Sequence, residues 1–254
     1  MAPTPGRLAG RLALITGASR GLGAALARRF AAEGAQLVLV ARTVGGLEET
    51  DDAVRRAGSS ATLVPLDLTD FDAIDRLGQS LHERFGRLDI LVGNAGALGT
   101  LSPVGHITTR DWAAVVNLNL TANWRLLRSF DRLLRASDAG RAIFVTDALV
   151  RAPKAYWGAY AATKAALETL VRVYADEVAN TRIRVNLVDP GRLRTALRAR
   201  AFPGEKPESL PAPESVAAAF VALAEAACAR HGELIVASDE GAPVSNVASR
   251  ERPR

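Results

Sequence analysis

Short apolar runs alternate with longer amphipathic segments along most of this 254-residue chain. The runs are rich in Val, Leu and Ile and do not alternate with polar residues, a pattern typical of parallel strands buried on both faces. The predicted strands are Leu12–Thr16, Gln36–Ala41, Ala61–Leu66, Leu88–Val92, Arg141–Thr146, Arg182–Leu187 and Glu233–Ala237. The predicted helices are Gly21–Glu33, Gly46–Ala57, Phe71–Phe85, Arg110–Arg135, Ala159–Asn180 and Pro213–Ala229. This alternation predicts an α/β protein with a doubly wound, Rossmann-like parallel sheet of about seven strands and helices on both faces.

No internal linker or repeat divides the chain. We therefore expect residues 1–254 to form one domain, with a core at about 11–237 and a C-terminal tail at 238–254. The Pro-rich stretch PGEKPESLPAP at 203–213 is better interpreted as a mobile flap than as a domain boundary.

Cysteine and histidine content argues against disulfide and metal chemistry. Cys228 is the only cysteine, so no internal disulfide can form, which favours a reducing cytoplasm. His82, His106 and His231 are scattered without metal-ligand spacing, so no metal is expected. The first ten residues lack the apolar stretch of a signal peptide, and no run reaches the roughly 18 apolar residues of a spanning helix. We expect a cytoplasmic protein with no membrane partner.

The formal net charge of +5 raises nucleic acid as a possible partner. The basic residues are dispersed, however, and clusters such as Arg28–Arg29, Arg55–Arg56 and the tail SRERPR are short. Solvated helix faces account for them. We expect no nucleic acid partner, and the composition suits an anionic small ligand at least as well.

A glycine-rich turn, TGASRGLG, follows the first predicted strand and leads into a helix. Glycines allow a tight turn and let a phosphate approach the backbone N–H groups at the helix start. The spacing is G-x-x-x-G-x-G, which does not strictly match the common dinucleotide fingerprint, and a plain strand-to-helix turn remains an alternative. The residues predicted to contact a cofactor here are Gly17, Ser19, Arg20, Gly21, Leu22 and Gly23.

The end of the second strand favours one cofactor over another. NAD-binding sheets usually place an acid there for the ribose hydroxyls, but here Ala41 and Arg42 follow Val40. Arg42 and Arg20 together suit the 2′-phosphate of NADP, because guanidinium groups match phosphate geometry. The sequence therefore favours NADP(H), although Arg42 alone could be an ordinary exposed arginine.

These motifs, with others in the same order, make the chain resemble the short-chain dehydrogenase/reductase family from about Arg11 to Ala237. The motifs that carry the resemblance are TGASRGLG at 16–23, LDL at 66–68, GNAG at 93–96, Asn119 within VNLNLTANW, YAATK at 160–164 and DPGRLRT at 189–195. The resemblance implies that Asp67 and Leu68 lie by the adenine, that Asn94, Ala95 and Gly96 line the cofactor path, and that Pro190, Gly191 and Thr195 face the nicotinamide. Gly93 departs from the usual asparagine of this family. The sequence is also similar to a bacterial subgroup without an assigned substrate.

Tyr160 and Lys164 are the predicted catalytic pair. They are four residues apart, which places both side chains on one face of a helix. Tyr156 has no lysine four residues later. A free tyrosine titrates near 10, and a nearby ammonium lowers that value. The resemblance implies that Tyr160 is the general acid/base, that Lys164 tunes it and binds the ribose, and that Asn119 holds a water in a proton relay.

Asp147 is the main departure from the family pattern. A serine that hydrogen-bonds the substrate carbonyl is expected thirteen residues before the tyrosine, and that position is Asp147. An ionised carboxylate about 5 Å away opposes phenolate formation by roughly 3 kcal/mol at an effective dielectric near 20. Three interpretations are open: a protonated Asp147 acts as the serine would, Asp147 pairs with a cationic substrate or with Arg151, or chemistry is lost. Thr146 is a poor replacement because adjacent strand residues point to opposite faces.

The resemblance implies hydride transfer between NADP(H) and a small-molecule carbonyl or alcohol. The alternative is a non-catalytic NADP(H)-binding or sensor protein. We expect substrate residues in the loop at 97–106, in residues 151–157 and in the flap after Thr195, whose Arg194, Arg198 and Arg200 could attract an acidic substrate. The family also implies a homodimer or homotetramer through the helices near 110–135 and 159–180. The apolar residues considered for that contact are Leu126, Leu127, Leu133, Leu167, Leu170 and Val171.

Overall fold

The computed structural model describes residues 6–237, and the predicted C-terminal tail at 238–254 lies outside the described residues. Seven strands form one sheet in the order β3-β2-β1-β4-β5-β6-β7, and every neighbouring pair is parallel. The strands are β1 (Leu12–Thr16), β2 (Gln36–Ala41), β3 (Ala61–Pro65), β4 (Ile90–Gly93), β5 (Arg141–Val145), β6 (Arg184–Asp189) and β7 (Leu234–Val236). The doubly wound parallel sheet predicted from the sequence is confirmed.

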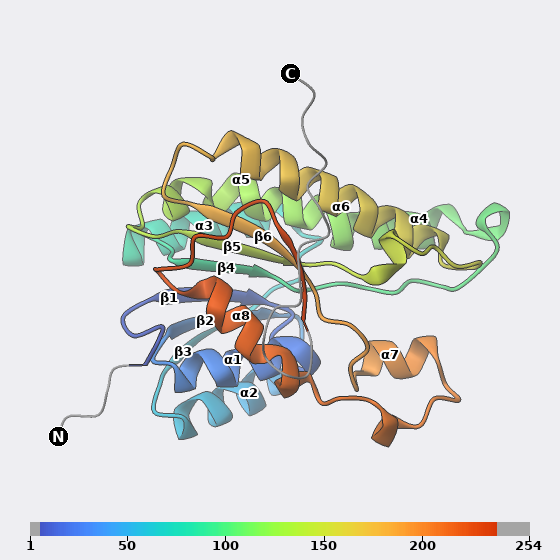
Figure 1. Cartoon of the computed structure of the whole chain (residues 1–254), viewed down its shortest axis with the longest axis horizontal. Helices are drawn as coiled ribbons and strands as arrows, with labels where there is room; N and C mark the ends of the chain where they lie inside the picture. The colour runs from blue at the N-terminus through green and yellow to red at the C-terminus, as the bar shows by residue number, and fades with distance from the viewer. Residues whose placement is uncertain (1–5, 238–254) are drawn as a thin grey trace.

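Helices cover both faces of this sheet (Figure 1). They are α1 (Gly21–Ala32), α2 (Val44–Arg56), α3 (Phe71–Phe85), α4 (Thr109–Val116), α5 (Ala122–Arg135), α6 (Gly158–Glu177), α7 (Ala196–Ala201) and α8 (Ala217–Ala224). One hydrophobic cluster packs α1, α2 and α8 against one face, and a second packs α3, α5 and α6 against the other. Strand β1 contributes to both clusters, with Ala13 and Ile15 in the first and Leu12 and Leu14 in the second. Burial on both faces explains why the strands read as continuous apolar runs.

The region predicted as one helix from Arg110 to Arg135 consists of three pieces. A π-helical turn, Asn117–Thr121, separates α4 from α5. The predicted helix Pro213–Ala229 is also shorter, because it opens with a 3₁₀ turn and α8 ends at Ala224. Helix α7 was not predicted. It lies beside the carboxyl ends of the strands and away from both helical layers (Figure 1).

The carboxyl ends of β1 and β4 define the position of the site. Strand order reverses there, since β1 has β2 on one side and β4 on the other. The hydroxyl of Thr16 donates to the carbonyl of Val92 (3.1 Å) and accepts from the backbone N–H groups of Asn94 (2.9 Å) and Ala95 (3.1 Å). In open α/β sheets ligands bind in the crevice at such a switch point.

Within residues 6–237, none of the helices has the length and apolar character that a membrane span requires. No group of His, Cys, Asp or Glu side chains in this part of the chain is arranged to hold a metal ion.

Candidate active site

A cavity of about 780 Å³ opens at the carboxyl ends of the strands. Its size is within the usual range for ligand pockets, roughly 300–1,000 Å³. Most of the predicted site residues line it: Gly17, Ser19, Arg20, Gly21, Leu22, Arg42, Asp67, Leu68, Asn94, Ala95, Gly96, Asp147, Tyr160, Lys164, Pro190, Gly191 and Thr195. Gly23 and Asn119 lie behind this lining instead of in it.

The backbone of the glycine-rich turn adopts a conformation and a close packing that require glycine. Gly17 and Gly21 have φ angles of +66° and +55°, which L-residues with side chains rarely adopt. A Cβ at Gly23 would lie 2.2 Å from the carbonyl oxygen of Gly17, so Gly23 allows the helix to pack close to the strand end. Helix α1 begins at Gly21 with no acidic residue in its first turn and no side-chain cap. Its first N–H groups are therefore suited to an anion such as a phosphate.

The rim near this turn is basic. Arg20 and Arg42 both line the cavity, and both side chains are exposed. Arg42 lies 3.8 Å from the carboxylate of Asp67, which in turn accepts hydrogen bonds from the backbone and hydroxyl of Thr69. No acid follows β2, as the sequence indicated. The turn and this rim together provide backbone N–H groups and exposed cations for the anionic groups of a ligand.

Tyr160 and Lys164 are on α6, and both line the cavity. Lys164 is buried, and its ammonium donates to the carbonyl oxygen of Val145 at 2.8 Å. Burial lowers the pKa of Lys164 to about 8, although the carboxylates of Asp147 and Glu168 act in the opposite direction. Its ammonium lies 5.8 Å from the centre of the Tyr160 ring. Tyr156, in contrast, is 58% exposed and does not line the cavity.

Asp147 lies directly against the hydroxyl of Tyr160. The phenol donates to Oδ2 of Asp147 at 3.2 Å, and Oδ1 accepts from the backbone N–H of Leu149 at 2.9 Å. Burial and then the charge and hydrogen bond of Asp147 raise the pKa of Tyr160 well above its ordinary value. The carboxylate therefore opposes the phenolate, in the direction that the sequence argument predicted.

Arg151 does not pair with Asp147, so this part of the second interpretation does not hold. The guanidinium of Arg151 pairs with Asp189 and lies 3.6 Å from Glu168. Both carboxylates are almost fully buried, and Glu168 also accepts from the hydroxyl of Thr146 at 2.8 Å. Buried carboxylates require such partners, so the charge of Arg151 is already balanced by Asp189 and Glu168. The hydroxyl of Thr146 is used by Glu168 in the same way.

The side chain of Asn119 is fully buried and ties two segments together. Its carbonyl accepts from the backbone N–H of Ala97 at 2.8 Å, and its amide donates to the carbonyl of Ala97 at 2.9 Å and to Thr163 at 3.2 Å. Its backbone belongs to the π-helical turn, a feature often found at functional sites. These bonds fix the segment after Gly96 against α6. The proton-relay role stays a prediction.

Packing explains why residue 93 is glycine and not the asparagine that is usual in this family. A Cβ at this position would lie 2.3 Å from the ring of Phe144 and 2.7 Å from the side chain of Asn123. The ring of Phe144 on β5 therefore occupies the space that a side chain at residue 93 would need. The departure concerns the sheet interior, and the cofactor path itself is lined by Asn94, Ala95 and Gly96.

Comparison with known proteins agrees with this geometry. The family model for short chain dehydrogenases matches residues 11–206. The chain belongs to the short-chain dehydrogenase family. It is therefore an oxidoreductase of a family that transfers a hydride with a nicotinamide cofactor.

Three relatives illustrate the match. The uncharacterized oxidoreductase YciK of Escherichia coli K12 is 36% identical over 209 residues, which cover 81% of this chain and 82% of that protein. The structure of a short chain dehydrogenase from Pseudomonas syringae superposes with a TM-score of 0.89 at 35% identity, over 92% of this chain and 97% of the other. A short chain dehydrogenase from Shigella flexneri 2a strain 301, complexed with NADP, gives a TM-score of 0.87 at 33% identity, over 92% and 99% of the two chains.

Several lining residues were not assigned from the sequence. Thr146, Asp189 and Phe202 line the cavity, and Glu168 supports it from behind. One signal was present for Glu168. It follows Lys164 by four residues on α6 and so shares the buried face of the catalytic pair.

Proposed function

We propose that this protein reduces a carbonyl compound, or oxidises the corresponding alcohol, with NADP(H) as cofactor and Tyr160 as general acid/base. The observation that carries the proposal is the hydrogen bond of the Tyr160 hydroxyl to Asp147, with a buried Lys164 on the same helix, in the cavity that the glycine-rich turn also lines. We also propose that residues 11–237 form one domain, because both hydrophobic clusters share one sheet.

Cofactor binding would use the residues at the switch point. The N–H groups at the start of α1 would hold the pyrophosphate, and Arg20 and Arg42 the 2′-phosphate. Asp67 and Leu68 would lie beside the adenine, Asn94, Ala95 and Gly96 would line the path, and Pro190, Gly191 and Thr195 would border the nicotinamide. The NADP in the complex of the Shigella flexneri relative supports this choice of cofactor.

The proton would pass through Tyr160. A bound nicotinamide supplies or accepts the hydride. In the reducing direction Tyr160 donates its proton to the substrate oxygen, and the Lys164 ammonium stabilises the negative charge that this leaves on the phenol. The Lys164 pKa of about 8 keeps most of these side chains protonated at neutral pH. The charge of Asp147 opposes this proton transfer because it raises the pKa of Tyr160 after burial has done so.

Asp147 would act in its protonated form. A substrate that fills the cavity removes water from Asp147, and a carboxylate without water or a cation is costly. The neutral acid can donate a hydrogen bond to the substrate carbonyl, as neutral carboxylic acids do elsewhere. Arg151 supports this proposal indirectly, because its charge is used by Asp189 and Glu168.

The direct test is NADPH consumption over a broad panel of carbonyl compounds. The native protein is expected to turn over at least one of them, and Tyr160→Phe to lower that rate by at least about 10²-fold while still binding NADPH. Tight NADPH binding with no turnover of any compound would instead favour a non-catalytic NADP(H) sensor.

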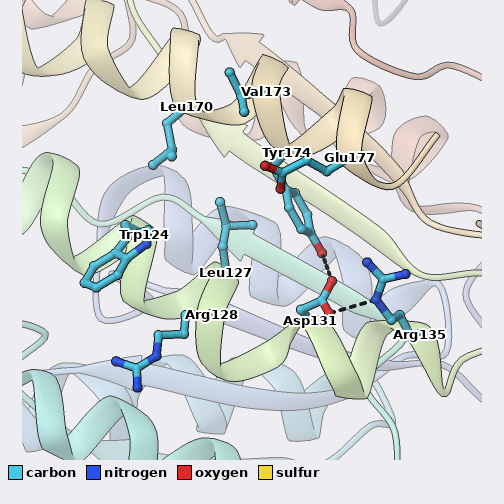
Figure 2. A pocket seen from close by; sticks show the side chains of 9 residues that line it. All are labelled: Trp124, Leu127, Arg128, Asp131, Arg135, Leu170, Val173, Tyr174 and Glu177. Carbon is cyan, nitrogen blue, oxygen red and sulfur yellow. Dashed lines mark hydrogen bonds and ion pairs between the residues drawn. The ribbon is translucent and has the colours of Figure 1, made fainter.

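We further propose that a second copy of the chain covers the face formed by α5 and α6. The residues considered from the sequence are mostly core: Leu126, Leu127, Leu133, Leu167 and Val171 are buried. The exposed apolar side chains are Trp124 (45%) and Val173 (50%), beside a shallow cavity of about 370 Å³ between the two helices (Figure 2). Light scattering should give the mass of a dimer or tetramer for the native protein and a smaller mass for Trp124→Glu. A monomeric native protein contradicts the proposal.

A further inference from the structure

We infer that the substrate is an elongated ring compound with a carboxylate at the end remote from the reacting carbon, and that Lys154 and Arg200 bind this carboxylate. The inference rests on the proposed function, because it assigns the substrate class of the same site. It comes from the half of the cavity that lies beyond Tyr160, away from the glycine-rich turn.

An apolar chamber forms that half of the cavity. Leu98, Leu149, Trp157 and Tyr160 make a third hydrophobic cluster, separate from the two that pack the sheet. Leu101, Leu197, Ala201 and Phe202 pack against it from the loop after β4 and from α7 and its carboxyl end. This apolar surface serves neither face of the sheet. Its function is therefore to enclose an apolar ligand body.

Aromatic rings line the chamber in series from the reactive phenol outwards. The rings of Tyr160 and Trp157 meet edge to face with centroids 5.8 Å apart and an interplanar angle of 71°. The rings of Trp157 and Phe202 follow at 5.6 Å and 33°. Such a row favours flat or alicyclic rings, because ring edges and faces pack well against one another. A ligand that reacts at Tyr160 and reaches Phe202 must be elongated.

Positive charge gathers at the Phe202 end. The ammonium of Lys154 lies 5.9 Å from the centre of the Phe202 ring, and Arg200 reaches the carbonyl of Gly99 at 3.3 Å. Both residues line the cavity. Among residues 6–237, neither has a carboxylate as a hydrogen-bond or ion-pair partner.

The neighbouring Arg198, unlike Lys154 and Arg200, has a carboxylate partner. Arg198 stacks on Phe202 at 3.7 Å and holds Glu205 through two hydrogen bonds, one of 2.8 Å. Arg198 lowers the pKa of Glu205, and the charge of Arg192 does so to a smaller extent. Arg194, which the sequence grouped with Arg198 and Arg200, does not line the cavity. Arg192 also lines the cavity, but its charge acts on Glu205. Lys154, against the Phe202 ring, and Arg200, against the loop at Gly99, are therefore the cations that we assign to a ligand.

The charges along the cavity suit one orientation of the ligand. Asp147 and Tyr160 stand at the reacting end, where a carbonyl needs hydrogen-bond donors and a carboxylate would be repelled. Lys154 and Arg200 stand at the other end, where a carboxylate would be attracted. A ring compound with the two groups at opposite ends satisfies both requirements at once.

A matched series of probes tests this inference. The probes are 4′-formylbiphenyl-4-carboxylate, its methyl ester and the corresponding trimethylammonium aldehyde. Binding is measured by calorimetry on the full chain saturated with oxidised NADP, where no reduction occurs, and turnover is measured separately with NADPH.

We expect the carboxylate to bind at least about tenfold more tightly than the ester, as one to two charge-assisted contacts imply. Lys154→Gln and Arg200→Gln should each weaken carboxylate binding about tenfold and leave ester binding unchanged. Lys154→Glu should shift the preference towards the trimethylammonium probe. Arg194→Gln, which removes an exposed charge outside the cavity, is the control and should bind all three probes as the native protein does.

Equal binding of carboxylate and ester overturns the inference, and so does an Arg194→Gln effect as large as that of Lys154→Gln. Failure of all three probes to bind also contradicts it. The proposed function is tested separately, by turnover. Charge-selective binding without turnover of any aldehyde rejects the reductase proposal and keeps the anion site, whereas turnover without charge preference does the reverse.

Discussion

The phenolic hydroxyl of Tyr160 donates a hydrogen bond to Oδ2 of Asp147 across 3.2 Å. The same carboxylate is held in place by the backbone N–H of Leu149. A buried phenol beside an acid is a weaker source of phenolate than a phenol beside a hydroxyl. The acid–base chemistry of this site therefore depends on Asp147 as much as on the Tyr160–Lys164 pair.

Replacing Asp147 should make Tyr160 easier to ionise. After burial, the charge of Asp147 and its hydrogen bond are the largest causes that raise the pKa of Tyr160. Asp147→Ser removes the charge, so the pKa of Tyr160 should fall. The pKa of Tyr160 is measured from the near-ultraviolet phenolate absorbance during an alkaline titration. The same titration of Tyr160→Phe is subtracted, so that the remaining signal belongs to this residue. An unchanged titration would show that Asp147 exerts no charge effect on the phenol.

Lys164 should make stability depend on pH between about 8 and 10.5. Burial lowers its folded-state pKa to about 8 from an ordinary value of 10.5. Within that window the unfolded chain binds more protons than the folded one, so the free energy of unfolding rises with pH. Relative to Lys164→Met, the native protein should gain on the order of 3 kcal/mol from pH 8 to 10.5. Urea unfolding of both proteins at several pH values measures this, and parallel curves would contradict it.

Arg42 should select NADPH over NADH. Its side chain is exposed, and its contact with Asp67 is a long 3.8 Å, so it is available to a phosphate. Arg42→Ala should weaken NADPH binding about tenfold and leave NADH binding and thermal stability almost unchanged. Fluorescence titration with both cofactors measures the ratio. Equal losses for NADPH and NADH would mean that Arg42 does not recognise the 2′-phosphate.

Tyr156 should carry local backbone strain. Its φ of +76° is in the left-handed region, and it is the single non-glycine residue with positive φ among residues 6–237. Asparagine adopts this region at lower cost, so Tyr156→Asn should raise the free energy of unfolding by about 1 kcal/mol. Calorimetry should show a melting temperature about 2–4 °C higher. Tyr156→Phe keeps the strain and serves as the control, and an equal gain in both variants would refute the explanation.

The sheet was predictable because each strand is buried on both faces. Leu12–Thr16 and Gln36–Ala41 have the same bounds in the sequence prediction and in the structure. The break at Asn117–Thr121 was not predictable, because the apolar pattern runs through the π-helical turn without interruption. Helix α7 has six residues, too few for a helical period to stand out.

The site was predictable where its residues are close in sequence. The glycine-rich turn and the Tyr160–Lys164 spacing are local patterns, and the structure brings both to one cavity. The contacts of Arg151 with Glu168 and Asp189 join a loop, a helix and a strand end, so no local spacing reveals them. The same holds for Phe202, which reaches Trp157 only through tertiary packing.

We propose that Asp147 works as a hydrogen-bond donor in an active reductase. The most direct test is the rate of NADPH-dependent carbonyl reduction by the native protein and by Asp147→Ser, measured across pH with one substrate. We expect the native protein to be active and its rate to fall with rising pH, whereas the serine variant should keep its rate over the same range. A native protein that is inert at every pH beside an active Asp147→Ser would contradict it.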